Sequence, residues 1–334
     1  MSRRTVLVTG GAGFIGSNIV RRLCEASDGD VVVCDWLDEV QTGKWRNLSA
    51  LPIADLIAPE ALREWLRGRG GEVELVIHMG AVSSTTDPDV DKVMGVNFGL
   101  SRDLWRWCAD NGRRFLWASS AATYGAGDHG FDDRQDVDWL AALRPLNPYG
   151  WSKALFDLFA VREAARGSAP PQWAGLKFFN VYGPGEGHKG PMRSVAAQIW
   201  PDVAAGRAVR LFRSYEAAWP DGGQQRDFVY VGDAVEVVAW LAANPQVSGV
   251  FNLGTGKARS FKALAEAVFA AAGYEPRIEY VDMPQELPPR YQYFTEARME
   301  RLRGAGYAAP FATLEEGISD YVRGHLSKTD PPSL

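Results

Sequence analysis

A glycine-rich turn near the start of the chain constrains its fold more than any other feature of the sequence. The β-branched run at residues 5–9 predicts a strand, and the apolar periodicity of residues 14–26 predicts a helix. Between them Gly10, Gly13 and Gly16 stand in a GxxGxxG spacing, where the missing side chains let the backbone approach a pyrophosphate. A strand, turn and helix of this kind typically open a doubly wound sheet that binds a dinucleotide; a tight turn without a ligand is the alternative.

The first half of the chain alternates between strand-like and helix-like segments. Further strands are predicted at 30–35, 74–79 and 113–119, separated by helices near 59–67 and 90–110. Strands spaced in this way by helices imply right-handed parallel crossovers, so we predict an α/β fold with a Rossmann-type doubly wound parallel sheet. Ligands of such sheets bind at the carboxyl ends of the strands.

The later half is less regular and predicts a smaller C-terminal α/β domain for the substrate. Its expected strands are 209–212, 227–231 and 250–254, and its expected helices lie near 194–205, 232–243, 260–272 and 312–325. We expect the segment from about 228 to 255 to return to the large sheet. The predicted dinucleotide-binding domain is 1–180 plus about 228–255, the predicted substrate domain is 181–227 plus 256–325, and 326–334 is expected to be a frayed tail.

The composition favours a small or nucleotide-type ligand. The 334 residues include 36 basic and 41 acidic side chains without long runs of either sign, which argues against a nucleic-acid or membrane partner. No apolar stretch approaches the roughly 20 residues of a membrane span. Three cysteines without CxxC spacing favour a reducing compartment, hence the cytoplasm, and four scattered histidines predict no metal site.

Asp35 ends the second predicted strand, 19 residues after the last glycine of the turn and close to the roughly 20 expected of an acid that binds a ribose. An acid there suits the free 2′-hydroxyl of NAD, whereas the 2′-phosphate of NADP would need nearby cations. Lys44 and Arg46 follow shortly afterwards, so the residues alone leave NAD and NADP open. Asp55 and Leu56 could border the adenine, or be an ordinary loop acid and a core residue.

A second group of residues points to proton transfer. An Asn-Pro pair at 147–148 is a good helix start, so Tyr149 and Lys153 should lie four residues apart on one face of a helix. An ammonium one turn away should lower the pKa of the tyrosine and favour its phenolate. Ser120, at the end of a predicted strand, could hydrogen-bond a substrate alcohol while Tyr149 takes its proton. The alternative for the tyrosine and the lysine is a solvated helix face.

These motifs together resemble those of the extended short-chain dehydrogenase/reductase family, whose members work on nucleotide sugars. The phrases NVYGPG (180–185) and RDFVYVGD (226–233) match that family's substrate domain, and the match runs from about Thr5 to about residue 320. The resemblance implies that Arg226 clamps the diphosphate of the substrate, a task suited to a planar bidentate cation.

The resemblance also distinguishes between reactions of the family. Its dehydratases carry an Asp-Glu pair where this chain has Ala121 and Ala122, which argues against dehydration. An epimerase needs less: a hydride leaves the alcohol carbon and returns to the other face of the resulting ketone.

The sequence GEGHKG (185–190) places a lysine in a glycine-rich turn beyond the predicted sheet. Inverting a secondary alcohol requires proton transfer from two different positions, unless the intermediate rotates in front of a single acid or base. Tyr149 can serve one epimer, and Lys189 is predicted to serve the other. A lysine that contacts a phosphate, or only solvent, is the alternative.

Within this family the chain most resembles the ADP-heptose 6-epimerases, on the strength of GGAGFIGSNIV, GAVSSTTD, ASSAATYGAG, NPYGWSK, FFNVYGPGEGHKG, RDFVYVGD, FNLGTG and RYQYFT. The resemblance implies NADP as a tightly held redox cofactor, with NAD possible, and oxidation at carbon six of an ADP-heptose for the lipopolysaccharide core. It also implies a homo-oligomer, usually a pentamer. The predicted catalytic residues are Tyr149, Lys189, Ser120 and Lys153.

The remaining site residues follow from the motifs and from the same resemblance. The predicted cofactor contacts are Gly10, Gly11, Gly13, Phe14, Ile15, Gly16, Asp35, Trp36, Lys44, Asp55, Leu56, Met79, Gly80, Ala81, Val82, Ser83, Asn97, Lys153 and Val181. The predicted substrate contacts are Ser84, Ser120, Asn180, His188, Pro191, Gln198, Phe212, Arg213, Ser214, Tyr215, Arg226 and Tyr291.

Three departures from the family pattern lie on the substrate side. Pro191 stands where serine is usual, Gln198 stands where histidine is usual, and the loop before Arg226 is longer than typical. They leave open an epimerase of another nucleotide sugar, such as one acting at carbon four of a hexose. A protein that senses NADP without turnover is the alternative from another class, although the intact Ser120, Tyr149 and Lys153 set favours an enzyme.

Overall fold

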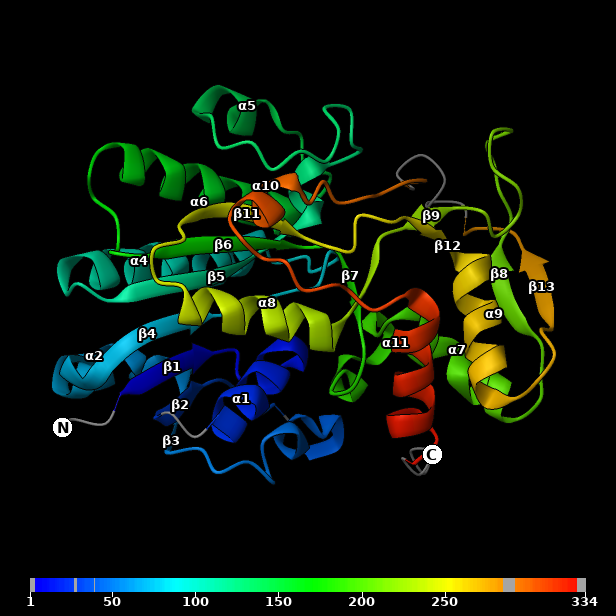
Figure 1. Cartoon of the computed structure of the whole chain (residues 1–334), viewed down its shortest axis with the longest axis horizontal. Helices are drawn as coiled ribbons and strands as arrows, with labels where there is room; N and C mark the ends of the chain where they lie inside the picture. The colour runs from blue at the N-terminus through cyan, green and yellow to red at the C-terminus, as the bar shows by residue number, and fades with distance from the viewer. Residues whose placement is uncertain (1–3, 27–28, 39, 285–291, 329–334) are drawn as a thin grey trace.

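Seven parallel strands form the central sheet (Figure 1). The computed structural model describes residues 4–26, 29–38, 40–284 and 292–328. In spatial order the strands are β11 (Gly249–Leu253), β6 (Trp173–Phe178), β5 (Arg114–Ser120), β4 (Val73–His78), β1 (Thr5–Thr9), β2 (Asp30–Cys34) and β3 (Asp55–Ile57). The chain runs outward from β1 in both directions, which confirms the predicted doubly wound Rossmann-type fold.

The strands predicted in the first half of the chain are confirmed as β1, β2, β4 and β5. Two more strands, β3 and β6, escape prediction from the sequence. β3 has only three residues, and β6 contains Gly175 and Lys177, which interrupt its apolar pattern. The predicted helix at 90–110 is a continuous helical segment, in which a π-helical turn, η5 (Gly95–Leu100), joins α3 and α4.

Helices cover both faces of the sheet. Ile77 of β4 lines a small hollow together with side chains of α1 and α8. The next residue, His78, stacks on Phe115, against which Trp105 of α4 and Phe156 of α6 pack edge-on. Because successive residues of a strand point to opposite faces, α1 and α8 form one layer and α4 and α6 the other. The helices of this part are α1 (Phe14–Ala26), α2 (Leu62–Arg69), α3 (Val90–Met94), α4 (Ser101–Asp110), α5 (Val137–Ala142), α6 (Pro148–Ala165), α8 (Val231–Ala243) and α10 (Glu300–Gly304).

Short strand pairs and further helices build a second, smaller lobe, at the right of Figure 1. Apolar side chains such as Val203, Leu264 and Ile318 form a hydrophobic cluster of their own there. This lobe confirms the predicted smaller α/β domain. Its strand pairs are β7 (Asn180–Tyr182) with β10 (Phe228–Tyr230), β8 (Val209–Phe212) with β13 (Ile278–Val281), and β9 (Gln225–Arg226) with β12 (Arg259–Ser260); its helices are α7 (Val195–Ala204), α9 (Phe261–Ala272) and α11 (Leu314–Tyr321).

The chain crosses between the two parts more than once. After building β8 and β9 it returns through α8 to β11, which pairs with β6 at the edge of the large sheet. The division into 1–180 with about 228–255, and 181–227 with 256–325, stays a prediction. The tail expected at 326–334 lies mostly outside the described residues.

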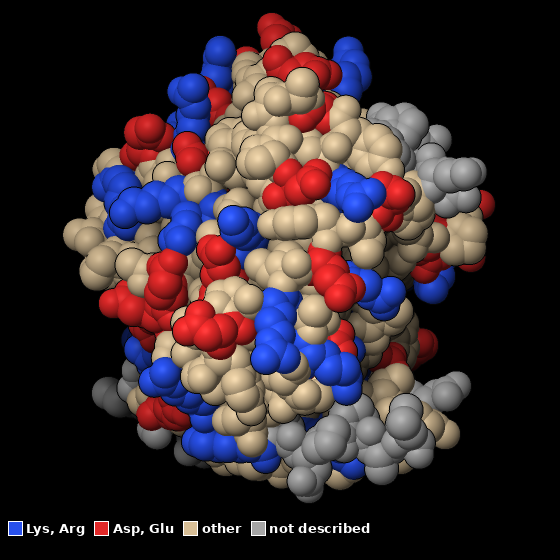
Figure 2. All heavy atoms as spheres, turned by 90° about the vertical axis from the view of Figure 1, so that its right-hand side faces the viewer, with Lys and Arg blue, Asp and Glu red and all other residues tan. Residues whose placement is uncertain are grey.

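Charged side chains of both signs are interspersed over the end of the molecule that Figure 2 shows, as the near-equal numbers of acidic and basic residues predict. In the described part of the chain, none of the helices combines the length and apolarity that a membrane span requires. Over the same residues, no three His, Cys, Asp or Glu side chains gather as a metal ion would require.

Candidate active site

The glycine turn brings the ends of two strands into contact. Gly10 has a φ of +66°, and a Cβ atom on it would lie 2.5 Å from the backbone nitrogen of Gly80, which follows β4. Only glycine therefore fits this position. Helix α1 begins at Phe14, so the unpaired amide groups of its first turn face the loop as an anion site requires. This cradle fits the pyrophosphate of a dinucleotide.

Asp35 lies beside the turn, where the sequence predicts a ribose contact. One of its carboxylate oxygens accepts a hydrogen bond from the Ala12 amide (2.9 Å), and the other pairs with the Lys44 amine (3.0 Å). Burial raises the pKa of Asp35, and the Lys44 ammonium opposes that shift. The carboxylate and the cation that bear on the choice between NAD and NADP therefore lie next to each other.

The predicted cofactor segment after β4, from Met79 to Ser83, is tied to the helix that carries Tyr149. The buried Asn97 amide accepts from the Val82 N–H (2.8 Å) and donates to the Val82 carbonyl (3.0 Å) and to the Ser152 hydroxyl (3.0 Å). Asn97 thus holds loop and helix together, and its direct contact with the cofactor stays a prediction.

Of the other predicted cofactor residues, some lie near the glycine turn and some do not. Trp36 directly follows Asp35, and its indole N–H donates to Glu60 (2.7 Å). Asp55 begins β3, whereas Asp35 lies level with the other end of that strand. The Asp55 carboxylate accepts a hydrogen bond from Trp65 of α2 (3.0 Å). The structure does not bring Asp55 to the glycine turn, and Leu56 beside it is exposed. Val181 lies on β7, paired with β10.

Ser120 and Tyr149 meet where β5 ends and α6 begins. The Asn147 side chain accepts from the Gly150 N–H (2.8 Å) and Pro148 occupies the first turn, so the predicted helix start is confirmed. A Cβ atom on Gly150 would lie 2.6 Å from the Ala122 carbonyl oxygen, so glycine is needed for α6 to approach the turn after Ser120. The Tyr149 hydroxyl and Ser120 are hydrogen-bonded.

The pKa of Tyr149 differs from the sequence prediction. Burial raises this pKa above its ordinary value, and the hydrogen bond with Ser120 opposes the rise only in part. Lys153 is not among the groups that shift this pKa, and its ammonium donates to the Ala118 carbonyl (2.8 Å). Burial also lowers the pKa of Lys153 to about 8, opposed by the Asp157 carboxylate.

A buried polar network under these residues was missed by sequence reasoning. Asp157 of α6 accepts hydrogen bonds from Lys177 (2.6 Å), Ser119 (2.6 Å) and Trp117 (3.1 Å). Lys177 also donates to Thr123 (2.8 Å), so the network brackets the segment that carries Ser120. Two signals pointed to it: Asp157 follows Lys153 by one helical turn, and Lys177 interrupts an otherwise apolar strand.

Lys189 lies in the turn η7 (Gly187–Met192), and its ammonium is 5.3 Å from the ring centre of Phe14. The side chain therefore turns inward, toward the first residue of α1. Burial lowers the pKa of Lys189, and the Glu186 carboxylate opposes this shift. Its neighbour His188 lies 3.4 Å (Nδ1) from the Asn47 amide nitrogen, which also donates to the Gly185 carbonyl (3.0 Å).

Pro191 and Gln198, two of the predicted departures from the family pattern, lie together beside that turn. The Gln198 amide donates to the Pro191 carbonyl (3.2 Å) and to the Arg193 carbonyl (2.7 Å). Gln198 therefore helps to hold the loop that carries Lys189. Gly190, between lysine and proline, has a φ of +54°.

Several predicted substrate residues lie on the second lobe. Arg226 is largely buried, with its guanidinium 5.5 Å from the ring centre of Phe261. Phe212 ends β8, and Arg213, Ser214 and Tyr215 continue into the long loop. Asn180 is exposed at the start of β7, Ser84 lies 3.3 Å (Oγ) from the Thr86 hydroxyl, and Tyr291 lies outside the described residues.

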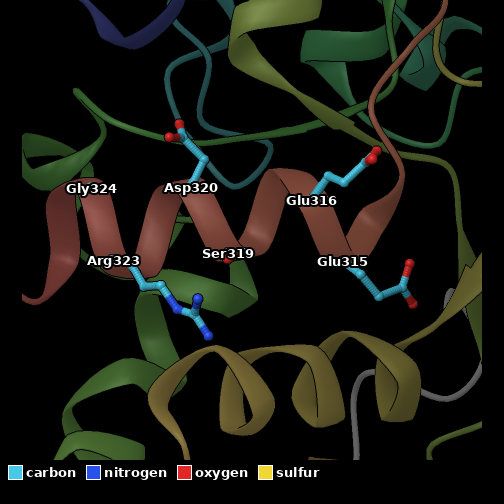
Figure 3. A pocket seen from close by; sticks show the side chains of 6 residues that line it. All are labelled: Glu315, Glu316, Ser319, Asp320, Arg323 and Gly324. Atoms are coloured by element: carbon cyan, nitrogen blue, oxygen red, sulfur yellow. The ribbon is translucent and has the colours of Figure 1, made fainter.

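A hollow of about 710 Å³ opens along α11, away from these groups. Figure 3 shows Glu315 and Arg323 on one side of the helix and Glu316 and Asp320 on the other. Their charged groups are engaged within the protein: Glu315 pairs with Arg259, and Arg323 donates to the Ala271 carbonyl. The hollow contains neither Tyr149 nor Lys189, so the active site is assigned to the groups at the glycine turn and α6.

A dinucleotide cradle beside a serine, a tyrosine and a lysine defines a nicotinamide-dependent enzyme of the Rossmann type. The sequence model of the NAD dependent epimerase/dehydratase family matches residues 6–254. The chain belongs to this family, and its cofactor is a nicotinamide dinucleotide.

Several named epimerases are similar to the chain over nearly its whole length. An ADP-L-glycero-D-manno-heptose-6-epimerase of Nitratidesulfovibrio vulgaris is 49% identical over 327 residues, covering 97% of this chain and 99% of the relative. The crystal structure of the Helicobacter pylori ADP-L-glycero-D-manno-heptose-6-epimerase is similar with a TM-score of 0.79 and 29% identity, covering 98% of this chain and 97% of that one. The Thermus thermophilus UDP-glucose 4-epimerase in complex with NAD has a TM-score of 0.74 and 29% identity, covering 96% and 99%.

Proposed function

We propose that the chain interconverts ADP-D-glycero-β-D-manno-heptose and ADP-L-glycero-β-D-manno-heptose, in heptose biosynthesis for lipopolysaccharide. The near-full-length similarity to enzymes named for this reaction supports the substrate. The observation that carries the mechanism is the inward position of Lys189, whose ammonium lies over Phe14 beside the glycine turn. Such a site holds an amine in addition to the phenol of Tyr149.

The reaction at carbon six balances within the site. The alcohol loses a hydride from carbon and a proton from oxygen, which leaves a planar ketone. The hydride returns to the other face of the ketone, a proton returns to the oxygen, and the configuration is inverted. When bound, the nicotinamide accepts the hydride and gives it back.

Tyr149 and Ser120 serve one of the two epimers. The Ser120 hydroxyl can hydrogen-bond the substrate oxygen while the Tyr149 hydroxyl, hydrogen-bonded to it, exchanges the proton. The Lys153 ammonium donates to the Ala118 carbonyl, near the strand end that carries Ser120. We assign to Lys153 the orientation of the cofactor and the supply of positive charge.

Lys189 serves the other epimer. A partly buried amine with a lowered pKa exchanges protons more readily near neutral pH than an exposed lysine does. With two groups on different segments, the ketone need not rotate through the site between the two proton transfers.

NADP is the proposed cofactor. The Lys44 amine pairs with Asp35, the acid predicted to meet the ribose, so the negative charge that would repel a 2′-phosphate is countered. The phosphate would meet the same cation. Release of the cofactor by heat and its mass would identify it, and finding NAD alone would overturn the assignment.

The substrate has a direct test. Purified protein is incubated with either ADP-heptose epimer, and both epimers are followed by NMR. Interconversion is expected from either side. Activity on another nucleotide sugar, such as a hexose at carbon four, without interconversion of ADP-heptose would contradict the heptose assignment. Cofactor binding without turnover of any of these sugars would favour a sensor.

The assembly and location follow from the family resemblance and cysteine content. We expect a cytoplasmic homo-oligomer, with five copies as the particular expectation, in which all three cysteines are thiols. Sedimentation equilibrium measures the number of copies.

A further inference from the structure

A buried carboxylate that the proposed mechanism does not use lies three residues before Lys189. The Glu186 side chain is 1% exposed. It accepts hydrogen bonds from the Ser194 amide (2.5 Å), the Ser194 hydroxyl (2.6 Å) and the Tyr321 hydroxyl (3.0 Å). None of these described donors is a cation. The Glu186 carboxylate is therefore held by three hydrogen bonds from neutral groups.

The donors to Glu186 belong to separate elements of the second lobe. Ser194 is the N-cap of α7, and Tyr321 is the last residue of α11. The Glu186 carbonyl oxygen accepts from the Lys189 amide (3.0 Å), so the backbone of the lysine is one turn away from the anchored residue. The carboxylate therefore fixes the base of the turn that carries Lys189 to two helices.

The same turn is held from the cofactor side by two asparagines. The Asn18 amide of α1 donates to the Pro184 carbonyl (2.8 Å), and the Asn47 amide donates to the Gly185 carbonyl (3.0 Å). Glu186 is the next residue. The segment before Lys189 thus bridges the two parts of the molecule. The side-chain amides of Asn18 and Asn47 hold its backbone on one side, and the Glu186 carboxylate binds α7 and α11 on the other.

The charges around Lys189 favour an electrostatic effect as well. Glu186 raises the pKa of Lys189 against the lowering caused by burial. His188 faces the same region from within the turn, and burial, Lys44 and Lys189 all lower its pKa. Phe14, from α1, contributes no charge, and the α11 contribution is the Tyr321 hydroxyl. The Arg193 guanidinium also acts there, because it opposes the rise in the pKa of Tyr321.

We propose that Glu186 is a positioning residue for Lys189: its carboxylate anchors the turn to α7 and α11 and keeps a negative charge near the amine. The proposal rests on the proposed function, in which Lys189 exchanges a proton with one epimer. Loss of the Glu186 charge should then affect that epimer and spare the one that Tyr149 serves.

The test compares Glu186→Gln with the unchanged holoenzyme. The rate at which each purified epimer reduces the bound oxidised cofactor is measured by the absorbance of the reduced nicotinamide, over a range of pH. At pH values where the amine is deprotonated in both proteins, we expect roughly tenfold slower oxidation of the Lys189-dependent epimer, because the turn has lost its anchor, and less than about twofold change for the other epimer. The pH profile of the affected step should move to lower pH by about half a unit or more, because the amine loses a nearby negative charge.

A second readout does not depend on turnover. The rate at which Lys189 is acylated by an amine reagent is measured against pH by mass spectrometry, in the unchanged protein and in Glu186→Gln. A shift of the titration to lower pH supports the proposal. An unchanged titration together with equal loss on both epimers would reduce Glu186 to a structural role and overturn it.

Matched variants keep the test decisive. Glu315→Gln removes a carboxylate from the exposed Glu315–Arg259 pair and should not change the oxidation rate of either epimer selectively.

If Glu186→Gln does not fold, two other variants test the same contacts. Ser194→Ala and Tyr321→Phe each remove one donor to Glu186 and should slow oxidation of only the Lys189-dependent epimer, by about twofold to fivefold. Equal rates for both epimers in these two variants would contradict the proposal. If Lys189→Met itself shows no preference between epimers, the two-base function fails, whereas the acylation titration still reports on Glu186.

Discussion

Lys177 and Asp157 form an ion pair of 2.6 Å between side chains that have no exposure to solvent. The pair joins β6 to α6, directly beneath the segment that carries Ser120. Asp157 also accepts hydrogen bonds from Ser119 and Trp117 of β5. A substitution of Asp157 therefore removes contacts at the end of the strand that carries Ser120.

Removing one member of this pair should be strongly destabilising. Asp157→Asn leaves the Lys177 ammonium buried without its counter-charge, so we expect the free energy of unfolding to fall by about 3–5 kcal/mol. Urea unfolding measures the loss. Glu163→Gln, which breaks the exposed pair with Arg166, is the control and should cost less than about 1 kcal/mol. Similar losses of unfolding free energy in both variants would show that the buried pair stabilises the fold no more than the exposed pair does.

Tyr149→Phe and Lys189→Met should separate the two proton transfers. Each variant loses one acid–base group, so we expect epimerisation to fall by about 100-fold to 10,000-fold in both. They should differ in which ADP-heptose epimer can still be oxidised. Stopped-flow measurement with each epimer provides the comparison, and identical losses on both epimers in both variants would refute the assignment of two groups.

Lys153 should make stability depend on alkaline pH. Burial lowers its pKa from 10.5 to about 8, so below about pH 8 the folded protein carries the full cost of a buried ammonium. Between about pH 8 and 10.5 the unfolded chain holds the proton that the folded state has lost, and stability rises with pH. Relative to Lys153→Met, the cofactor-free protein should gain about 3 kcal/mol over this range. Parallel stability curves for the two proteins would contradict the shift.

Lys44 should set the preference for NADP. In Lys44→Ala the Asp35 carboxylate loses its nearest cation, and a 2′-phosphate would meet an uncompensated negative charge. We expect NADP to bind about tenfold or more weakly while NAD binding changes little. Calorimetric titration of the cofactor-free protein with both dinucleotides measures this difference. An equal loss for NAD and NADP would place the lysine away from the 2′ position.

Gly150→Ala should disturb the contact between Tyr149 and Ser120. The added Cβ atom would lie 2.6 Å from the Ala122 carbonyl, which forces the start of α6 away from the turn after β5. We expect a stability loss of about 1–3 kcal/mol and at least a tenfold loss of turnover, checked by thermal unfolding and the NMR assay. Gly68→Ala in α2, where a Cβ atom meets nothing within 4 Å, is the control and should leave turnover unchanged.

Local patterns allowed much of the fold and part of the site to be predicted. The glycine turn, the Asn147 cap and the four-residue spacing of Tyr149 and Lys153 each depend on neighbours along the chain, so their chemistry is visible in the sequence. β3 escaped prediction because three residues cannot display a periodicity.

The contacts that escaped prediction join distant segments. The hydrogen bond from Tyr321 to Glu186 spans 135 residues, and nothing in the sequence near either residue indicates it. The pKa of Tyr149 was predicted in the wrong direction for a similar reason. The spacing to Lys153 is local, whereas burial of the phenol and capture of the ammonium by Ala118 depend on how α6 packs on β5.

The return of β11 to the edge of the large sheet limits how such a protein can be rearranged. A gene cut between the lobes would strip β6 of its outer neighbour and leave an open strand edge prone to aggregation. The two lobes therefore cannot be exchanged between proteins as separate stretches of sequence. New sugar preferences have to arise by changing surface loops on an otherwise fixed frame, and the extended loop from Arg213 to Gly223 is the obvious place for such changes.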